Sequence, residues 1–290
     1  MTYLDSARVL QEKYLEPLHP DLATTYNNIG VVYLTQGKNK EALKWIDKAL
    51  EIREKVLDPL HPDLATTYNN KGSAYWGQGK NEEALKWYDK SLEIREKVLD
   101  PLSPDLAQSY NNKGSVYWGQ GKYEEALKWI DKALEIYEKI LDPLHPDLAT
   151  IYNNKGAVYS YQGKKEEAMK WYDKSLEIRE KVLDPLHPDL ANIYNNKGVV
   201  YFEQGKYEEA LKWYDKALEI CEKVLDPLHH YLVNTYRHIG LAYKGMKNYE
   251  KALEYFEKAL PGYIEFYGIF SRNYVVLRLM IEECKQALGE

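Results

Sequence analysis

The sequence predicts an all-α protein: a right-handed α-solenoid, or superhelix, of tandem helical hairpins closed by a C-terminal capping helix. The first observation is a repeat. The stretch Tyr-Asn-Asn-Lys-Gly-Ser-Ala-Tyr at 68–75 returns every 42 residues, at 26–33, 110–117, 152–159, 194–201 and, in degraded form, 236–243. Periods of this size are typical of repeat architectures. The second observation is that each repeat carries start and stop signals for two helices.

The second repeat shows these helix signals. His-Pro-Asp at 61–63 opens the first helix, because Pro suits the first helical position and Asp complements the helix dipole. This helix is expected to run to about Gln78, where Gly79 ends it in the left-handed conformation. The second helix is expected over about 81–99, because Pro101 cannot continue it and restricts the residue before it. A single hairpin cannot bury its apolar faces, but stacked hairpins can.

The 42-residue period also divides the chain. Residues 1–18 align with the second helix of a repeat, so they are expected to form a half repeat. It is either a natural cap or, as we favour, the start of a fragment cut from a longer array. Residues 269–290 are expected to form the capping helix, and Pro261 is expected to interrupt the helix before it. Six repeats lie between, at 19–60, 61–102, 103–144, 145–186, 187–228 and 229–268.

Composition narrows the function classes. A net charge of −6 at pH 7 argues against a broad nucleic-acid-binding face, which needs clustered basic residues. No apolar run approaches the length of a membrane span, and the N-terminus does not resemble a secretory signal. Cys221 and Cys284 are too few for a disulfide framework or a zinc site. We therefore expect a reducing compartment and a cytoplasmic location.

No pattern in the sequence indicates catalysis. The chain holds no phosphate-binding loop, no nucleophile–histidine arrangement and no pair of catalytic carboxylates, and the Gly-Gln-Gly-Lys run at 77–80 is explained by a helix end. We expect neither an enzyme nor a bound metal or other cofactor. One loop histidine per repeat cannot converge on a metal ion. A role at helix starts is expected for His19, His61, His145, His187 and His229, with Ser103 as the stronger cap in the third repeat.

These features resemble the tetratricopeptide repeat, whose motif has an aromatic residue, Gly and Tyr in the first helix and small–aromatic–small in the second. The 42-residue form, with Ile-Arg-Glu-Lys at 94–97 and His-Pro-Asp at 61–63, is similar to the repeats of kinesin light chain and related bacterial arrays. The resemblance implies a superhelix whose first helices line a concave, peptide-binding groove. The motif positions are Tyr68, Gly72, Tyr75, Ala84, Tyr88 and Ser91.

At one position this sequence differs from the tetratricopeptide repeat motif. The residue before the motif Gly is expected to be apolar, as Ile29 and Ile239 are. In the four repeats between them it is Lys, at Lys71, Lys113, Lys155 and Lys197. The stem of such a lysine can pack while its ammonium reaches water.

Helical arithmetic at 100° per residue defines a candidate binding face. In the first helix it places Thr66, Asn69, Ser73, Trp76 and Gly77 opposite the core face. Amides offer donors and an acceptor to an extended peptide backbone; alternatively, one Asn of each pair bonds a neighbouring helix. The central ladder is Asn27, Asn69, Asn111, Asn153, Asn195 and Arg237. The flanking ladder is Asn28, Asn70, Asn112, Asn154, Asn196 and His238.

Trp76 and Trp118 extend this face by one turn, and Leu34, Ser160 and Phe202 stand at the same position in other repeats. The two tryptophans either form an apolar pocket in adjacent repeats, since Trp is a frequent hot-spot residue, or pack under a neighbouring helix. Only Arg237 offers a cation beside the ladder, which argues against a clamp for a peptide carboxylate. A second tryptophan series follows the period in the second helices and is expected to be structural: Trp45, Trp87, Trp129, Trp171 and Trp213.

The leading hypothesis is a non-catalytic scaffold for protein–protein interaction that binds an extended peptide segment in the groove. Its partner would be a protein or peptide, not nucleic acid or a membrane. One alternative is a sensor or regulatory array cut from a larger multidomain effector. The other is a self-assembling scaffold, because an open first repeat could let chains associate end to end.

Overall fold

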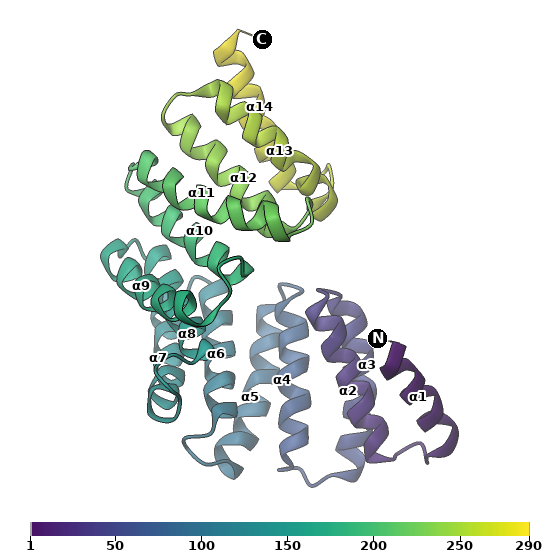
Figure 1. Ribbon diagram of the computed structural model, residues 1–290. Helices are drawn as coiled ribbons and strands as arrows, with labels where there is room; N and C mark the ends of the chain where they lie inside the picture. The colour runs from purple at the N-terminus through teal and green to yellow at the C-terminus, as the bar shows by residue number, and fades with distance from the viewer. Residues whose placement is uncertain (1, 290) are drawn as a thin grey trace. The chain divides into compact units, whose positions relative to one another are not determined.

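The computed structural model describes residues 2–289, and every regular element in that range is an α-helix (Figure 1). The predicted all-α class is therefore confirmed. The chain forms two compact units, unit 1 up to Asp142 and unit 2 from Pro143. Unit 1 contains α1 (Thr2–Tyr14), α2 (Pro20–Thr35), α3 (Asn39–Val56), α4 (Pro62–Trp76), α5 (Asn81–Val98), α6 (Pro104–Gly119) and α7 (Tyr123–Ile140). Unit 2 contains α8 (Pro146–Tyr161), α9 (Lys165–Val182), α10 (Pro188–Glu203), α11 (Tyr207–Val224), α12 (His230–Gly245), α13 (Tyr249–Tyr267) and α14 (Arg272–Leu288).

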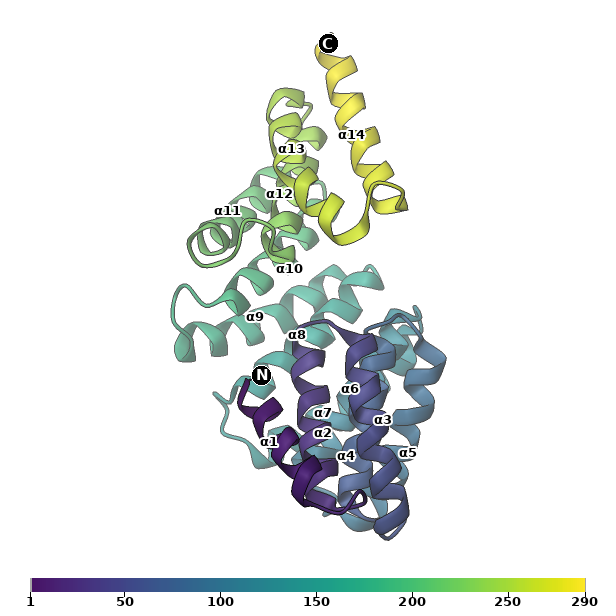
Figure 2. The same cartoon turned by 90° about the vertical axis from the view of Figure 1, so that its right-hand side faces the viewer.

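Most of these helices pair as hairpins. In unit 1 the pairs are α2 with α3, α4 with α5, and α6 with α7; in unit 2 they are α8 with α9, α10 with α11, and α12 with α13 (Figure 2). We call the first helix of a pair helix A and the second helix B. Within each unit, helix B of one hairpin also packs against helix A of the next. The apolar faces of neighbouring hairpins thus cover one another, as in a solenoid.

The A helices begin where the sequence signals predict. His61 is the N-cap of α4, and its Nδ1 accepts a hydrogen bond from the Asp63 backbone N at 3.1 Å. Each of the other four loop histidines caps a helix in the same way. Ser103 caps α6 through its hydroxyl. The predicted helix-start role is confirmed. α4 ends at Trp76, two residues earlier than expected, and Gly79 has the predicted left-handed conformation, with φ of 73°.

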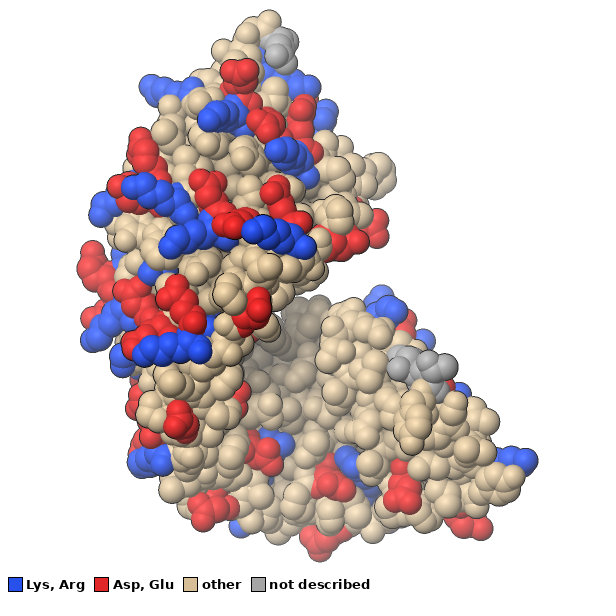
Figure 3. Space-filling view, in the orientation of Figure 1, with Lys and Arg blue, Asp and Glu red and all other residues tan. Residues whose placement is uncertain are grey.

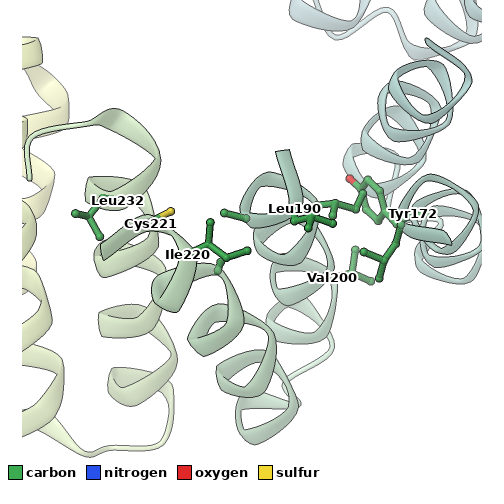
Figure 4. Packing of buried hydrophobic residues seen from close by; sticks show 11 residues of the cluster. Tyr172, Leu190, Val200, Ile220, Cys221 and Leu232 are labelled. Carbon is green, nitrogen blue, oxygen red and sulfur yellow. The ribbon is translucent and has the colours of Figure 1, made fainter. Parts of the chain in front are cut away.

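The motif glycine sets the distance between helices A and B. A Cβ atom on Gly72 would lie 2.7 Å from the ring of Tyr88, which is 1% exposed. Only a residue without a side chain allows this approach. In unit 2 the apolar side chains of consecutive helices form a continuous cluster, of which Figure 4 labels Tyr172, Leu190, Val200, Ile220, Cys221 and Leu232.

Polar side chains join one hairpin to the next. The Tyr68 hydroxyl donates to Glu54 Oε1 on the preceding helix B at 3.0 Å. The buried Arg95 guanidinium donates through Nη1 to Ser109 Oγ at 2.6 Å and to the Asp105 carbonyl at 2.8 Å. Because a buried guanidinium without acceptors would be costly, these bonds fix the position of α6 on α5.

The lysines before the motif Gly differ from expectation. Lys197 Nζ lies 2.6 Å from Asp173 Oδ1 on the preceding helix B and 3.9 Å from the ring centroid of Trp213 in its own hairpin. Its side chain is only 5% exposed. Lys113 is held in the same way by Asp89 and Trp129. The expectation that these ammonium groups reach water is therefore wrong, because a carboxylate and an aromatic face replace water around them.

The expected interruption at Pro261 is also wrong. α13 continues through this proline to Tyr267. Proline removes one backbone hydrogen bond, but the turn that contains it is held by packing. Gly262 lies against Val233, so closely that a Cβ atom would overlap it, and Tyr263 is buried.

α14 occupies the place of a further helix A. Its N-cap, Ser271, stands 42 residues after His229, the N-cap of α12. Leu277, Ile281 and Cys284 are buried against α13. The face that would meet a following helix B exposes Val275 and the ion pair of Arg278 and Glu282 at 3.1 Å. A polar outer face is typical of a helix that caps a repeat array.

Candidate functional site

The two asparagine ladders bond to each other. In both units the flanking Asn of one helix A donates through Nδ2 to Oδ1 of the central Asn on the preceding helix A. These bonds tie neighbouring A helices together, as the alternative interpretation of the ladders requires. They join Asn70 to Asn27 at 3.0 Å, Asn112 to Asn69 at 3.1 Å, and Asn196 to Asn153 at 2.9 Å.

Burial limits what these amides offer to a ligand. Asn27, Asn69 and Asn195 are each at most 8% exposed. Asn28, at the start of the flanking ladder, is exposed. The remaining members are half-buried: Asn70, Asn111, Asn112, Asn153, Asn154 and Asn196. Contact of the ladder with a peptide stays a prediction, since much of its bonding capacity is used between helices.

The ladder breaks in α12, where Arg237 and His238 replace the Asn pair. Asn195 Nδ2 donates to Thr235 Oγ1 at 2.7 Å, but its buried Oδ1 has no partner among the described residues. The buried Nδ1 of His238 also lacks one. Burial and the nearby Arg237 lower the pKa of His238 to about 3. The imidazole is therefore neutral at physiological pH, and the bond that would continue the ladder is not made.

The two tryptophan series occupy different places. Trp76 is 40% exposed at the end of α4, and a Cβ atom on Gly119 of the next helix A would lie 3.8 Å from its Nε1. Trp118 is half-buried at the equivalent place in α6. The helix B series is structural, as expected: Trp87 lies 5.5 Å from Tyr68 of its own hairpin, centroid to centroid. The other four pack in the same tilted arrangement against the equivalent tyrosines.

A cavity opens beside the break in the ladder. It has a volume of about 170 Å³ and is lined from α10, α11 and α12 of unit 2. Val199 and Leu241 stand at the position of Ser73, Phe202 at that of Trp76, Glu203 at that of Gly77 and Arg237 at that of Asn69. Five lining residues thus stand at positions of the predicted binding face. The full lining is Val199, Phe202, Glu203, Tyr214, Arg237, His238 and Leu241.

Besides His238, two polar side chains of this cavity, Tyr214 and Arg237, have no hydrogen-bond or ion-pair partner within the described chain. In the second repeat the Tyr88 hydroxyl lies 3.0 Å from Ser73 Oγ. Val199 replaces that serine here, and the hydroxyl of Tyr214, which is 1% exposed, makes no hydrogen bond with a described residue. Burial, together with the Glu203 carboxylate, raises the pKa of Tyr214, so the phenol stays protonated. Arg237 makes no ion pair with a described carboxylate.

Sequence reasoning found part of this site. It identified Arg237 and assigned Phe202 to the tryptophan position. It missed Tyr214, which the repeat pattern assigns to the core, and it missed Glu203. Glu203 stands at the position of Gly77, already assigned to the binding face, and applying the helical wheel to every repeat would have found it.

Other classes of site find no support in the described residues. Among residues 2–289, no three His, Cys, Asp or Glu side chains gather as a metal site would require. No helix in that range is both long and apolar enough to cross a membrane. The face shown in Figure 3 carries basic side chains among acidic ones, so it presents no continuous basic surface for nucleic acid.

Comparison with known families identifies the chain as a member of the tetratricopeptide repeat family. A family model described as tetratricopeptide repeat matches residues 2–55, 21–97, 105–181 and 189–265, and a second model of the same description matches residues 69–139. Among curated proteins no relative matches.

Solved structures of repeat arrays share the fold. The nearly identical repeats assigned to a kinesin light chain of Podosopora anserina are 21% identical, with a TM-score of 0.58 over 72% of this chain and 99% of theirs. BtubC (BKLC) from P. vanneervenii is 21% identical, with a TM-score of 0.60 over 79% of this chain and 89% of its own. A signal transduction ATPase with a tetratricopeptide repeat sensor, from Pyrococcus horikoshii, is 19% identical. Its TM-score is 0.66 over 93% of this chain and 40% of its own. These likenesses confirm the predicted α-solenoid.

Proposed function

We propose that this protein is a non-catalytic scaffold that binds an extended segment of a partner protein along the exposed face of its A helices. The observation that carries the proposal is the cavity in unit 2, because residues at the predicted binding-face positions of α10 and α12 line it. Trp76 adds an exposed aromatic side chain at the equivalent position in unit 1. Aromatic and Arg side chains are enriched among residues that dominate protein-binding energies.

The buried Asn ladder would contribute to this function indirectly. Its amides hold successive A helices in a fixed spacing, so the exposed side chains beside them would recur at regular intervals. An extended peptide also presents side chains at regular intervals. We therefore assign peptide contact mainly to exposed residues of the A helices, and spacing to the asparagines.

Capture of partners by variants of the full chain tests the proposal. Trp76→Ser and Phe202→Ser each install the residue that the fourth repeat carries naturally, Ser160, so the fold should tolerate them. The double variant should lose most capture of proteins from a lysate or of peptides from an array. Lys86→Ala, on the exposed surface of a B helix, is the matched control and should retain capture. Equal capture by all variants would contradict the proposal.

A regulatory array within a larger effector is the second candidate. The neighbour from Pyrococcus horikoshii motivates it, because its repeats serve as the sensor of a signal transduction ATPase. A catalytic or nucleotide-binding domain encoded in the same reading frame would favour this candidate, and a full-length reading frame limited to repeats would count against it.

End-to-end stacking is the third candidate, and the charge on α14 disfavours it. Glu282 stands 42 residues after Gly240, where a Cβ atom would lie 2.6 Å from the ring of Phe256. A helix B from another chain could not approach α14 that closely. We therefore expect light scattering to give a mass that does not change with protein concentration; a rising mass would restore the stacking hypothesis.

A further inference from the structure

We propose that the cavity between α10 and α12 is a specificity pocket that takes one uncharged, apolar side chain of an extended peptide, with Arg237 and Glu203 bonding the peptide backbone beside it. This inference rests on the proposed function and names the residue class that the binding face selects. Five observations support it: apolar walls, a size that fits one side chain, uncharged Tyr and His side chains, a hydroxyl in the lining without a protein partner, and two unpaired charges of opposite sign.

The walls and the volume define the kind of side chain. Val199, Phe202 and Leu241 supply apolar surface from two neighbouring A helices. A volume of about 170 Å³ corresponds to roughly five or six water molecules at about 30 Å³ each. That is more than a methyl group fills, and it suits a branched aliphatic or aromatic side chain. Filling apolar space is the main source of affinity in pockets of this kind.

The interior excludes a charged side chain. Tyr214 and His238, two polar residues of the lining, are both uncharged at neutral pH. A charged ligand group would meet both Arg237 and Glu203, so attraction to one is opposed by repulsion from the other, and its lost hydration costs free energy. The Tyr214 hydroxyl can still donate a hydrogen bond to a carbonyl oxygen of the ligand.

The two charges at the cavity complement a peptide backbone. Arg237 offers N–H donors to a backbone carbonyl, and the exposed Glu203 offers carboxylate acceptors to a backbone N–H. Their charges cancel, so the pair does not select an acidic or a basic segment. A peptide residue with an apolar side chain satisfies the walls and both charges together.

The second repeat lacks the substitutions that form this pocket. In the second repeat, Ser73 bonds the hydroxyl of Tyr88, and Asn69 accepts from Asn112. In unit 2, Val199 stands at the position of Ser73 and His238 at that of Asn112. Tyr214 therefore lacks the serine partner, and Asn195 Oδ1 lacks the amide partner. Selection of the apolar residue would therefore occur at one end of the repeat array.

Small backbone-blocked amino acids test the pocket without knowledge of the partner. The probes are the N-acetyl N′-methylamides of Leu, Phe, Ala, Glu and Lys, titrated into the full chain to about 20 mM. The readout is the imidazole NMR signals of isotope-labelled histidine, assigned to His238 by the His238→Asn variant. We expect the Leu or Phe probe to shift this signal with a dissociation constant on the order of 1 mM. The Ala, Glu and Lys probes should bind at least about tenfold more weakly.

Variants locate the binding site. Leu241→Trp should fill the cavity and weaken the Leu probe by more than about tenfold. Ala157→Trp is the matched control, because it adds the same side chain at the equivalent position of α8, and it should leave binding unchanged. Val199→Phe serves as a second filling variant if circular dichroism shows that Leu241→Trp disturbs the fold. Arg237→Asn should weaken the Leu probe by about fivefold.

Three results would overturn the pocket: no shift of the His238 signal with any probe, binding of the Glu or Lys probe as tight as that of Leu, or equal effects of Leu241→Trp and Ala157→Trp. Any of these results would contradict the pocket but not the proposal that the chain captures a partner through Trp76. Conversely, loss of capture by the Lys86→Ala control would count against the scaffold proposal and not against the pocket.

Discussion

Replacing Asp173 by Asn should destabilise the chain more than replacing its partner Lys197 by Ile. The two groups form an ion pair at 2.6 Å, but their environments differ: the lysine side chain is 5% exposed and the aspartate side chain 60% exposed. Asp173→Asn leaves a buried ammonium without its counter-charge, whereas Lys197→Ile leaves only a carboxylate that water can solvate.

The magnitudes follow from this asymmetry. Breaking a buried pair by removing one partner costs about 3–5 kcal/mol. Trp213 still contacts the ammonium at 3.9 Å in the Asn variant, and such a contact contributes about 0.5–2 kcal/mol. We therefore expect Asp173→Asn to cost roughly 2 kcal/mol. Lys197→Ile should lie within about 0.5 kcal/mol of the parent, because Ile239 is fully buried at the same repeat position.

Urea unfolding of the full chain, followed by helical circular dichroism, measures both effects as shifts of the midpoint at a common slope. In the Lys197→Ile background, Asp173→Asn should cost less than about 0.5 kcal/mol, so the double-mutant cycle returns a coupling of about 1.5–2 kcal/mol. A Lys197→Ile cost equal to or larger than that of Asp173→Asn would refute the reasoning.

Three further expectations concern single positions. Asn69→Ala should cost about 1–2 kcal/mol in urea unfolding, because Asn112 loses its buried acceptor, while Ala at the exposed Asn28 should cost nothing measurable. His238, whose pKa falls from 6.5 to about 3 on folding, should destabilise the chain as pH drops from about 6.5 toward 3, since the unfolded chain takes up the proton first. Between about pH 7 and 5, the free energy of unfolding of His238→Asn should therefore fall by about 2 kcal/mol less than that of the parent. Parallel plots of unfolding free energy against pH for the two proteins would exclude this role. Lys247→Gly should stabilise the chain by about 1 kcal/mol and so raise its thermal midpoint. The reason is that Lys247 has a φ of 61° at a position where the other repeats carry Gly. An unchanged midpoint would show that the left-handed lysine is not strained.

Repeat arithmetic explains why the fold was predictable. Stop signals at Gly79 and Pro101, and the N-cap at His61, act within a few residues of the chain. Because the sequence repeats every 42 residues, the same helix start and stop signals recur in each hairpin. The failure at Pro261 shows the limit of local rules: packing of Gly262 on Val233 holds the helix where the chain alone would break it.

The sequence predicts which side of a helix A carries the binding face, but it does not predict which residues on that side are exposed. A helical wheel places Asn69 and Trp76 on one side of α4, and it treats them alike. The structure shows that Asn69 is buried and bonded while Trp76 is exposed. That difference depends on how close the next helix A lies, a distance that the sequence of one helix does not contain.

The sequence by itself determined the helices, their pairing and the repeat, because capping, glycine and proline effects are local and the period is explicit. Only the tertiary structure decided which polar residues are buried and what they contact. Lys197 is buried because Asp173 comes from one hairpin and Trp213 from another. The cavity at Arg237 exists because Val199, Tyr214 and Leu241 meet from three helices. Burial of a charge and opening of a cavity are properties of several segments in contact, and no single segment specifies them.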